Sequence, residues 1–294
     1  MPSDLSYIHL PKDEGAHPEM ITEWWYSNFT LRDSNGQQYG AMAAYFNSGP
    51  RVLSISDIDE KQFYSEVSFS TPRYAEGPLY LRWGSSDSWF RKEPDAFSYH
   101  LKSHGNKVSL NIDIDSLKPP LLVNGDGLIK WSFGSSYYYS LTRLRAKGQI
   151  ELLGKAVDVE GIGWMDHQWM DFIPAAVIRC YEWFSVQLDN NTDVVFWQAT
   201  EPDGALVSHL LTIVYPDGSV FYTRDFTLQR KDSWISPNSR CEYGIMWKVR
   251  EQTRNLRLVV KALFPEQEIK IPITLPGFRP AFWEGKMTVS GQLA

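Results

Sequence analysis

The chain has 294 residues, a formal net charge of −6 and 43% hydrophobic residues, which fits one large or two medium globular domains and excludes a disordered chain. The negative charge and the lack of lysine or arginine clusters argue against a nucleic-acid partner. We see neither a basic start followed by an apolar run nor an apolar stretch long enough to span a bilayer, so we expect a cytoplasmic protein without stable membrane insertion.

The first predicted strand covers Trp24–Leu31 and begins directly after Glu23. Side chains alternate along a strand, so Trp24, Tyr26 and Asn28 share one face. This face fits a pocket for a mostly apolar ligand with one polar end, and it fits a barrel core equally well. If Glu23 is buried against apolar groups, its pKa rises and it can serve as a general acid; a glutamate at a strand start is more often exposed or paired.

Further strand signals follow along the chain. Asp33-Ser34-Asn35-Gly36 predicts a hairpin turn before the strand Gln38–Phe46, which carries Tyr45 as another candidate for the pocket. Tyr215-Pro216-Asp217-Gly218 predicts a second hairpin after the strand Leu206–Val214. No window of a dozen residues shows sustained helical periodicity. The sequence therefore predicts an all-β protein with few short helices.

The densest chemical signal is Gly163-Trp164-Met165-Asp166-His167-Gln168-Trp169. In an extended strand, His167 and Trp169 share one face, and Asp166 and Gln168 share the other. Imidazole transfers protons near neutral pH, and an indole face stabilises a cation. This combination suits a site that creates positive charge on a hydrocarbon. The alternative interpretation is a satisfied buried Asp166–His167 pair among core tryptophans.

A weak internal repeat indicates two domains. Trp25-Tyr26-Ser27 and Trp183-Phe184-Ser185 each lead through a strand into a hairpin turn rich in Asp and Asn. This order favours two similar barrels, residues 1–153 and 154–294, with the boundary near Gly154. The central motif then lies at the entry to the second half, where a cleft between the domains would accept a small molecule.

The run WMDHQW at 164–169, preceded by two glycines, resembles the signature of the AttH-like, carotenoid 1,2-hydratase-like family. Three other segments fit the family's pattern in the same order, as does Tyr138-Tyr139-Ser140. These segments are HPEMITEWWYSNFTL at 17–31, EWFSVQLDN at 182–190 and FWEGKMTVSG at 282–291. The resemblance implies two lipocalin-like β-barrels in tandem, a hydrophobic polyene or terpenoid-like substrate, and no cofactor. The family includes hydratases and Diels-Alder cyclases.

The resemblance also compares individual residues. The His-x-Trp pair of the carotenoid hydratases corresponds to His167 and Trp169, while their Tyr-x-Asp pair falls on Phe196-Trp197-Gln198. An amide cannot protonate an alkene, although Gln198 can orient a carbonyl or hydroxyl group. This difference weakens carotenoid hydration and leaves room for a cyclase or an isomerase.

We therefore expect an enzyme of natural-product biosynthesis that cyclises a hydrophobic substrate held between two barrels. A hydratase acting on an isolated double bond and a non-catalytic carrier are the alternatives. The catalytic candidates are His167, Glu23 and Asp166. The substrate-binding candidates are Trp24, Tyr26, Tyr45, Trp169, Phe196, Trp197 and Gln198. His17 joins His167, Glu23 and Asp166 as acceptable metal ligands, but no close histidine spacing favours a metal, so we expect none.

Overall fold

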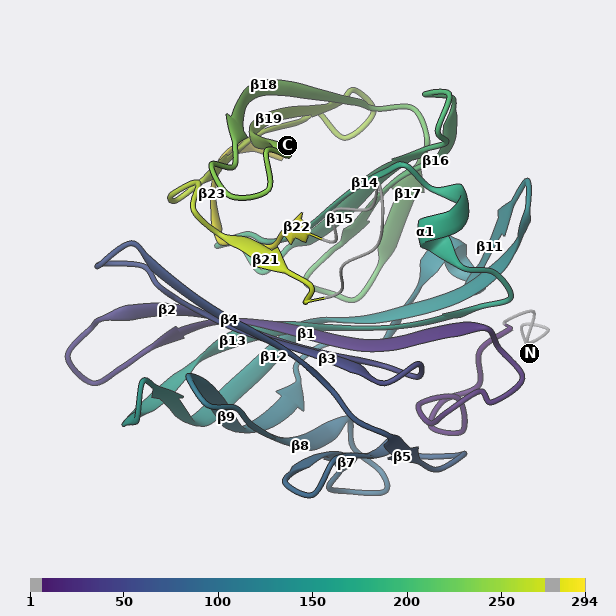
Figure 1. Cartoon of the computed structure of the whole chain (residues 1–294). Coiled ribbons are helices and arrows are strands. Elements are labelled where there is room, and N and C mark those ends of the chain that lie inside the picture. Colours follow the sequence, from purple (N-terminus) through teal and green to yellow (C-terminus); the bar gives the residue numbers. More distant parts are fainter. Residues whose placement is uncertain (1–6, 273–280, 294) are drawn as a thin grey trace.

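A computed structural model describes residues 7–272 and 281–293 and shows a nearly all-β protein in two layers (Figure 1), which confirms the predicted fold class. The lower layer is one 13-stranded sheet with the order β4-β3-β2-β1-β13-β12-β9-β8-β7-β6-β5, and β10 and β11 pair with β12 beside this path. Its strands are β1 (Thr22–Arg32), β2 (Gln38–Phe46), β3 (Pro50–Asp57), β4 (Gln62–Phe69), β5 (Pro72–Tyr74), β6 (Tyr80–Trp83), β7 (Asp87–Arg91), β8 (Ser98–His104), β9 (Val108–Ser116), β10 (Leu121–Leu122), β11 (Leu128–Trp131), β12 (Gly134–Leu152) and β13 (Lys155–Met170). A 3-10 turn, Val123–Gly125, separates β10 from β11.

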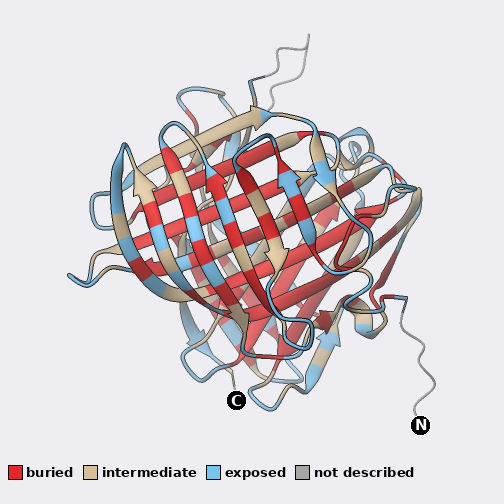
Figure 2. Ribbon diagram, turned by 90° about the horizontal axis from the view of Figure 1, so that it is seen from below, coloured by how far each residue is buried: buried red, intermediate tan, exposed pale blue. Residues whose placement is uncertain are grey.

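The large sheet curls so that strands distant in its order meet. Arg51 on β3 pairs with Asp87 on β7, with 2.6 Å between Nη1 and Oδ2. The enclosed core contains Trp25, Trp89 and Tyr99, all with 0% exposure. Figure 2 shows the result from below, with buried and exposed positions alternating along the outer strands of the curled sheet. This period of two matches the alternation read from the sequence.

The upper layer contains two four-stranded sheets that enclose a second core. One sheet is β14 (Cys180–Gln187), β15 (Asp193–Thr200), β16 (Leu206–Val214) and β17 (Val220–Thr223), and the other is β18 (Thr227–Ile235), β19 (Glu242–Glu251), β20 (Leu256–Ala262) and β23 (Met287–Gln292). Between them pack Phe196, Leu211, Val249 and Leu258. A small sheet of β21 (Glu268–Lys270) and β22 (Ala281–Trp283) completes the layer. Both predicted hairpins, β1–β2 and β16–β17, are confirmed.

The sheets do not divide at residues 153/154, where the sequence analysis placed the domain boundary. Gly154 lies in the hairpin between β12 and β13, and β13 pairs with β1 from Arg32–Glu160 to Thr22–Met170. Residues 155–170 therefore belong to the N-terminal sheet. The chain crosses to the upper layer through the short helix α1 (Pro174–Val177). A left-handed glycine at a turn, here Gly154 with φ 81°, marks a hairpin as readily as a domain linker.

The two layers are joined by an apolar contact and by a buried ion network. Tyr138 and Trp164 from the large sheet pack against Trp197 and its neighbours on β15 and β16. Asp193 on β15 pairs with Lys118 at 2.8 Å and with Arg143 at 2.7 Å. Because these charges are buried with their partners, the network fixes how β15 sits on the large sheet. Within the part of the chain that the structure describes, no helix is long and apolar enough to cross a membrane.

Candidate functional site

Strand β13 presents the central motif to two different environments. It lies between β1 and β12, and its side chains alternate as predicted. His167 and Trp169 point into the core of the curled sheet, whereas Trp164 belongs to the cluster that contacts the upper layer. Asp166 also faces the upper layer, because it bonds the Trp164 indole. The two catalytic candidates Asp166 and His167 therefore lie on opposite faces of the sheet, as the alternation along the strand predicted.

The face toward the curled core carries a cluster of His17, Glu23 and His167, which we call the histidine cluster. Glu23 Oε1 lies 2.8 Å from Nδ1 of His17 and 2.9 Å from Nε2 of His167, and Glu23 Oε2 accepts a bond from the His17 backbone at 3.0 Å. The His17 ring stacks on Trp169 at 3.8 Å, and the His167 ring stacks on Trp25 at 4.7 Å. His167 and Glu23 are 0% and 1% exposed.

The electrostatics of this cluster oppose the proposed acid role of Glu23. Burial alone would raise the pKa of Glu23, but the bonds from His167 and His17 outweigh it and lower that pKa. Burial lowers the pKa of His167, and the bond to Glu23 offsets only part of this effect. The pair is therefore a carboxylate and a neutral imidazole. The predicted raised pKa of Glu23 is wrong, because two imidazoles stabilise its charged form.

The same three residues place metal-type ligand atoms together. One ligand atom from each of His17, Glu23 and His167 lies within 4.8 Å of the others, which the sequence spacing did not indicate. Glu23 Oε1 already contacts both imidazoles, so hydrogen bonding satisfies the buried carboxylate. The absence of a metal stays a prediction.

The opposite face of β13 carries the acid group of a second cluster. Asp166 lies directly across from Tyr26 on β1 and from Ser140 on β12. Its Oδ1 accepts bonds from the Ser140 hydroxyl at 2.6 Å and from Nε1 of Trp164 at 2.7 Å. The pKa of Asp166 is raised to about 7, mainly by burial. The bonds from Ser140 and Trp164 lower this pKa, and the charge of Glu284 raises it. The Asp166 carboxyl group therefore takes up and releases its proton near neutral pH.

Side chains of the upper layer complete this cluster. Trp183 on β14 meets the Tyr26 ring edge-on at 5.6 Å and donates from Nε1 to the Tyr138 hydroxyl at 3.0 Å. The Tyr26 hydroxyl donates to Glu284 at 2.6 Å. Tyr181 lies two residues before Trp183 and is 42% exposed. Burial of its hydroxyl and the charge of Asp166 raise the pKa of Tyr181.

We call this set, Tyr26, Asp166, Tyr181, Trp183 and Glu284, the inter-sheet cluster. Tyr26, Trp183 and Glu284 are only half-buried although they lie between two layers of sheet. These partly exposed side chains therefore lie at the junction between the two layers. An aromatic site with a carboxyl group that titrates near neutral pH can bind an apolar molecule and offer it a proton.

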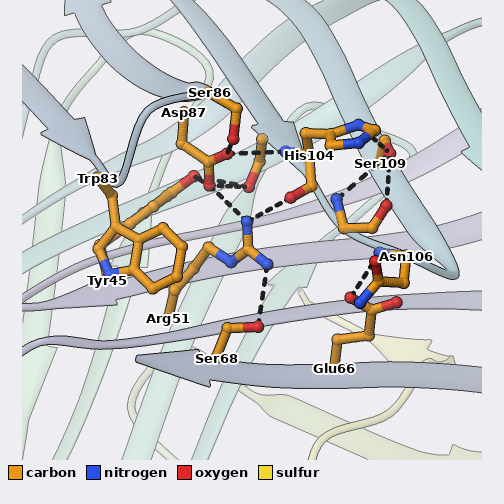
Figure 3. Close-up of polar contacts among 12 residues, drawn as sticks. Tyr45, Arg51, Glu66, Ser68, Trp83, Ser86, Asp87, His104, Asn106 and Ser109 are labelled. Atoms are coloured by element: carbon orange, nitrogen blue, oxygen red, sulfur yellow. Dashed lines mark hydrogen bonds and ion pairs between the residues drawn. The ribbon is translucent and has the colours of Figure 1, made fainter. Parts of the chain in front are cut away.

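Two other binding candidates occupy different surroundings. Trp24 lies on the Tyr26 face, opposite Gln168 and near the Phe46 ring at 6.3 Å. Tyr45 points into the curled core with 0% exposure, where it bonds Ser103 at 2.6 Å and Asp87 at 3.0 Å. Figure 3 shows Tyr45 and Asp87 beside Arg51. Tyr45 therefore braces a buried ion pair and lies away from the inter-sheet cluster.

The three candidates on β15 also separate. Trp197 packs against Tyr138 at 6.0 Å and supports the inter-sheet cluster from behind. Phe196 faces the other way and stacks on Phe184 in the upper core. Gln198 shares the Phe196 side of β15 and donates to the Glu182 carboxylate. Gln198 therefore faces the upper core and not the inter-sheet cluster.

Sequence reasoning missed several members of the site. Ser140, Trp183 and Glu284 all lie in segments that match the family pattern, yet none was assigned a role. Ser140 was visible in the Tyr-Tyr-Ser match, and Glu284 in the FWEGKMTVSG segment. The sequence motifs therefore contained these residues, but only their contacts across the layers show that they belong to the site.

Comparison with known proteins identifies relatives of the whole chain. A family model described as AttH-like matches residues 2–294. A solved structure described as an AttH from Nitrosomonas europaea has a TM-score of 0.85 and 19% identity, covering 100% of this chain and 95% of that one. Kievitone hydratase from Nectria haematococca has a TM-score of 0.80 and 18% identity, covering 96% and 87%. No curated protein matches the chain. At these identities the two structures support the fold.

Proposed function

Because the chain belongs to the AttH-like family, we propose that it is an enzyme that adds water to an isolated carbon–carbon double bond of a hydrophobic small molecule. The observation that carries this proposal is the buried carboxyl group of Asp166, which Ser140 and Trp164 hold at the edge of the inter-sheet cluster and whose pKa burial raises to about 7. The name of the hydratase among the structural neighbours agrees with it. In this proposal the proton that the Gln198 amide on β15 cannot donate comes from Asp166 on β13.

The proposed reaction balances with water alone. The Asp166 proton moves to one alkene carbon as the π electrons form the new C–H bond, which leaves a carbocation and a carboxylate. Water attacks the cation, and the resulting oxonium returns a proton to Asp166. The rings of Tyr26 and Trp183 would stabilise the cation through their faces. A positioned acid with a pKa near the working pH contributes about 10²–10⁴-fold in rate.

Cyclisation is the second candidate, and the aromatic lining favours it. Trp164, Trp183 and Tyr26 meet edge-on around the same space. A cation shielded by these rings could be captured by a second double bond of the same substrate instead of by water. Both reactions then begin with the same proton transfer, and they differ only in which nucleophile reaches the cation.

The test is turnover of acyclic isoprenoid alkenes in ¹⁸O-labelled water by the native protein, Asp166→Asn and the exposed control Asp158→Asn. We expect a labelled alcohol from the native protein and the control, and at least a hundredfold loss in Asp166→Asn. A ring product without label would favour cyclisation. Turnover that survives Asp166→Asn would remove Asp166 as the acid, and saturable binding without any product would leave a carrier.

A further inference from the structure

The Lys286 side chain packs over a glycine of the large sheet and extends to the edge of the inter-sheet cluster. Its stem lies over Gly40 on β2, where a Cβ atom would come within 2.3 Å of Lys286 Cγ. Only a residue without a side chain leaves room for the stem at this position. The Lys286 backbone N–H donates to Gln267 at 3.0 Å, and Gln267 also accepts from Ser56 on β3 at 2.8 Å. The lysine is therefore held against the large sheet by a buried amide.

The ammonium group of Lys286 lacks the partner that other buried cations have. Arg51, Lys118 and Arg143 each lie within 4.0 Å of a carboxylate. Over residues 7–272 and 281–293, no such pair includes Lys286, whose one close polar contact is Asn28 Oδ1 at 3.5 Å. The charge of Glu284 acts on it only electrostatically. A half-buried cation without a carboxylate in direct contact gains stability when a ligand supplies one.

The neighbouring groups connect Lys286 to the proposed acid. Asn28 donates from Nδ2 to the Tyr26 hydroxyl at 3.2 Å, and that hydroxyl is already committed to Glu284. Glu284 therefore bonds Tyr26 directly and acts on the Lys286 ammonium through its charge alone. Asn28 lies two residues along β1 from Tyr26, a separation of about 7 Å, and Tyr26 is directly opposite Asp166.

We propose that Lys286 binds a carboxylate on the substrate, so that the substrate is an amphiphilic organic acid whose apolar body extends across Tyr26 and Trp183 toward Asp166. The inference rests on the proposed use of the inter-sheet cluster and narrows its substrate class. The substrate carboxylate would lie beside Asn28, roughly 7 Å along β1 from Tyr26, the residue opposite Asp166. This spacing fixes which part of the substrate meets the acid.

Binding of retinoic acid and retinol tests the assignment, because the two probes share an apolar body and differ in the charged end. Affinity is read from quenching of tryptophan fluorescence, without any need for turnover. We expect the native protein to prefer the acid by about tenfold, as a charge-assisted hydrogen bond provides. Lys286→Gln should abolish the preference, whereas Lys261→Gln, which removes an exposed charge on β20, should keep it. Gly40→Ala should weaken acid binding by displacing the lysine stem.

The native protein offers a second measurement. Burial lowers the pKa of Lys286 to about 8, while the charge of Glu284 opposes this. The titratable groups near Lys286 are Glu284 and Tyr26, with Asp166 farther away, and none of these three carries a positive charge. The preference for retinoic acid should therefore fall as pH rises through 8, although the probe stays ionised.

Equal binding of the two probes overturns the proposal, as does absent binding of the acid. A preference that survives in Lys286→Gln or above pH 9 overturns it as well. Because this readout is affinity, it stands apart from the turnover loss expected of Asp166→Asn. A hydratase with no acid preference would contradict the anchor alone, and an acid preference without turnover would contradict the reaction alone.

Discussion

Nε2 of His167 lies 2.9 Å from Oε1 of Glu23, on the face of the sheet opposite the acid Asp166. The pair is fully enclosed; the His167 ring stacks on Trp25 and packs at a tilt against Trp169. Neighbours in sequence thus perform separate tasks. His167 and Glu23 brace the junction of β13 with β1, while Asp166 faces the space between the layers.

Glu23→Gln should destabilise the protein by about 2–3 kcal/mol, because the substitution removes a charged acceptor whose hydrogen bonds lie in the core. Urea unfolding at neutral pH measures the change. Glu160→Gln, at an exposed position on β13, is the matched control and should unfold like the native protein. Equal unfolding midpoints for all three proteins would contradict a bracing role.

Stability should respond to pH with opposing contributions from the two faces. The folded-state pKa of His167 is lowered by burial, so the unfolded chain takes up the proton first and stability falls as pH drops below about 6.5. Glu23, whose folded-state pKa is also lowered, extends the loss below its usual value of about 4.3. Asp166 acts in the other direction, because its pKa of about 7 makes the folded state hold a proton that the unfolded state has released.

In Asp166→Asn only the first two contributions remain. The free energy of unfolding should therefore rise more steeply between pH 5 and 7 in this variant than in the native protein. Urea titrations at half-unit intervals measure both slopes. Parallel slopes would show that the carboxyl of Asp166 titrates normally.

Turnover should fall as pH rises through about 7, since the proposed reaction needs the protonated form of Asp166. Initial rates between pH 5.5 and 9 at saturating substrate measure this dependence. A rate that increases through the same interval would require a group that acts as a base, and would point away from Asp166 as the proton donor.

Trp183→Ala should weaken binding of apolar ligands by about tenfold or more, because the lost ring covers the centre of the inter-sheet cluster. Fluorescence titration with retinol measures the affinity. Trp234→Ala removes an indole from β18, where the ring stacks on Tyr243 in the upper layer, and should leave the affinity unchanged. If both variants bind like the native protein, the ligand lies elsewhere.

Local patterns in the sequence predicted the elements well. The alternation in residues 163–169 predicted which side chains share a face, and the Asx-Gly turns predicted two hairpins that form. The period of two is a backbone property, so it can be read without knowing the neighbours. The sequence could not show that the turn at Gly154 is a hairpin within the large sheet, because a hairpin and a linker use the same residue types.

The sequence by itself determined that the chain is all-β and that Asp166 and His167 face opposite ways. Only the tertiary structure decided which face meets the core and which meets the upper layer, because that depends on the curl of the large sheet. It also brought Glu284 beside Tyr26, 258 positions apart in the chain. The pKa of Asp166 follows from such contacts, since burial and charge are set by groups distant in sequence.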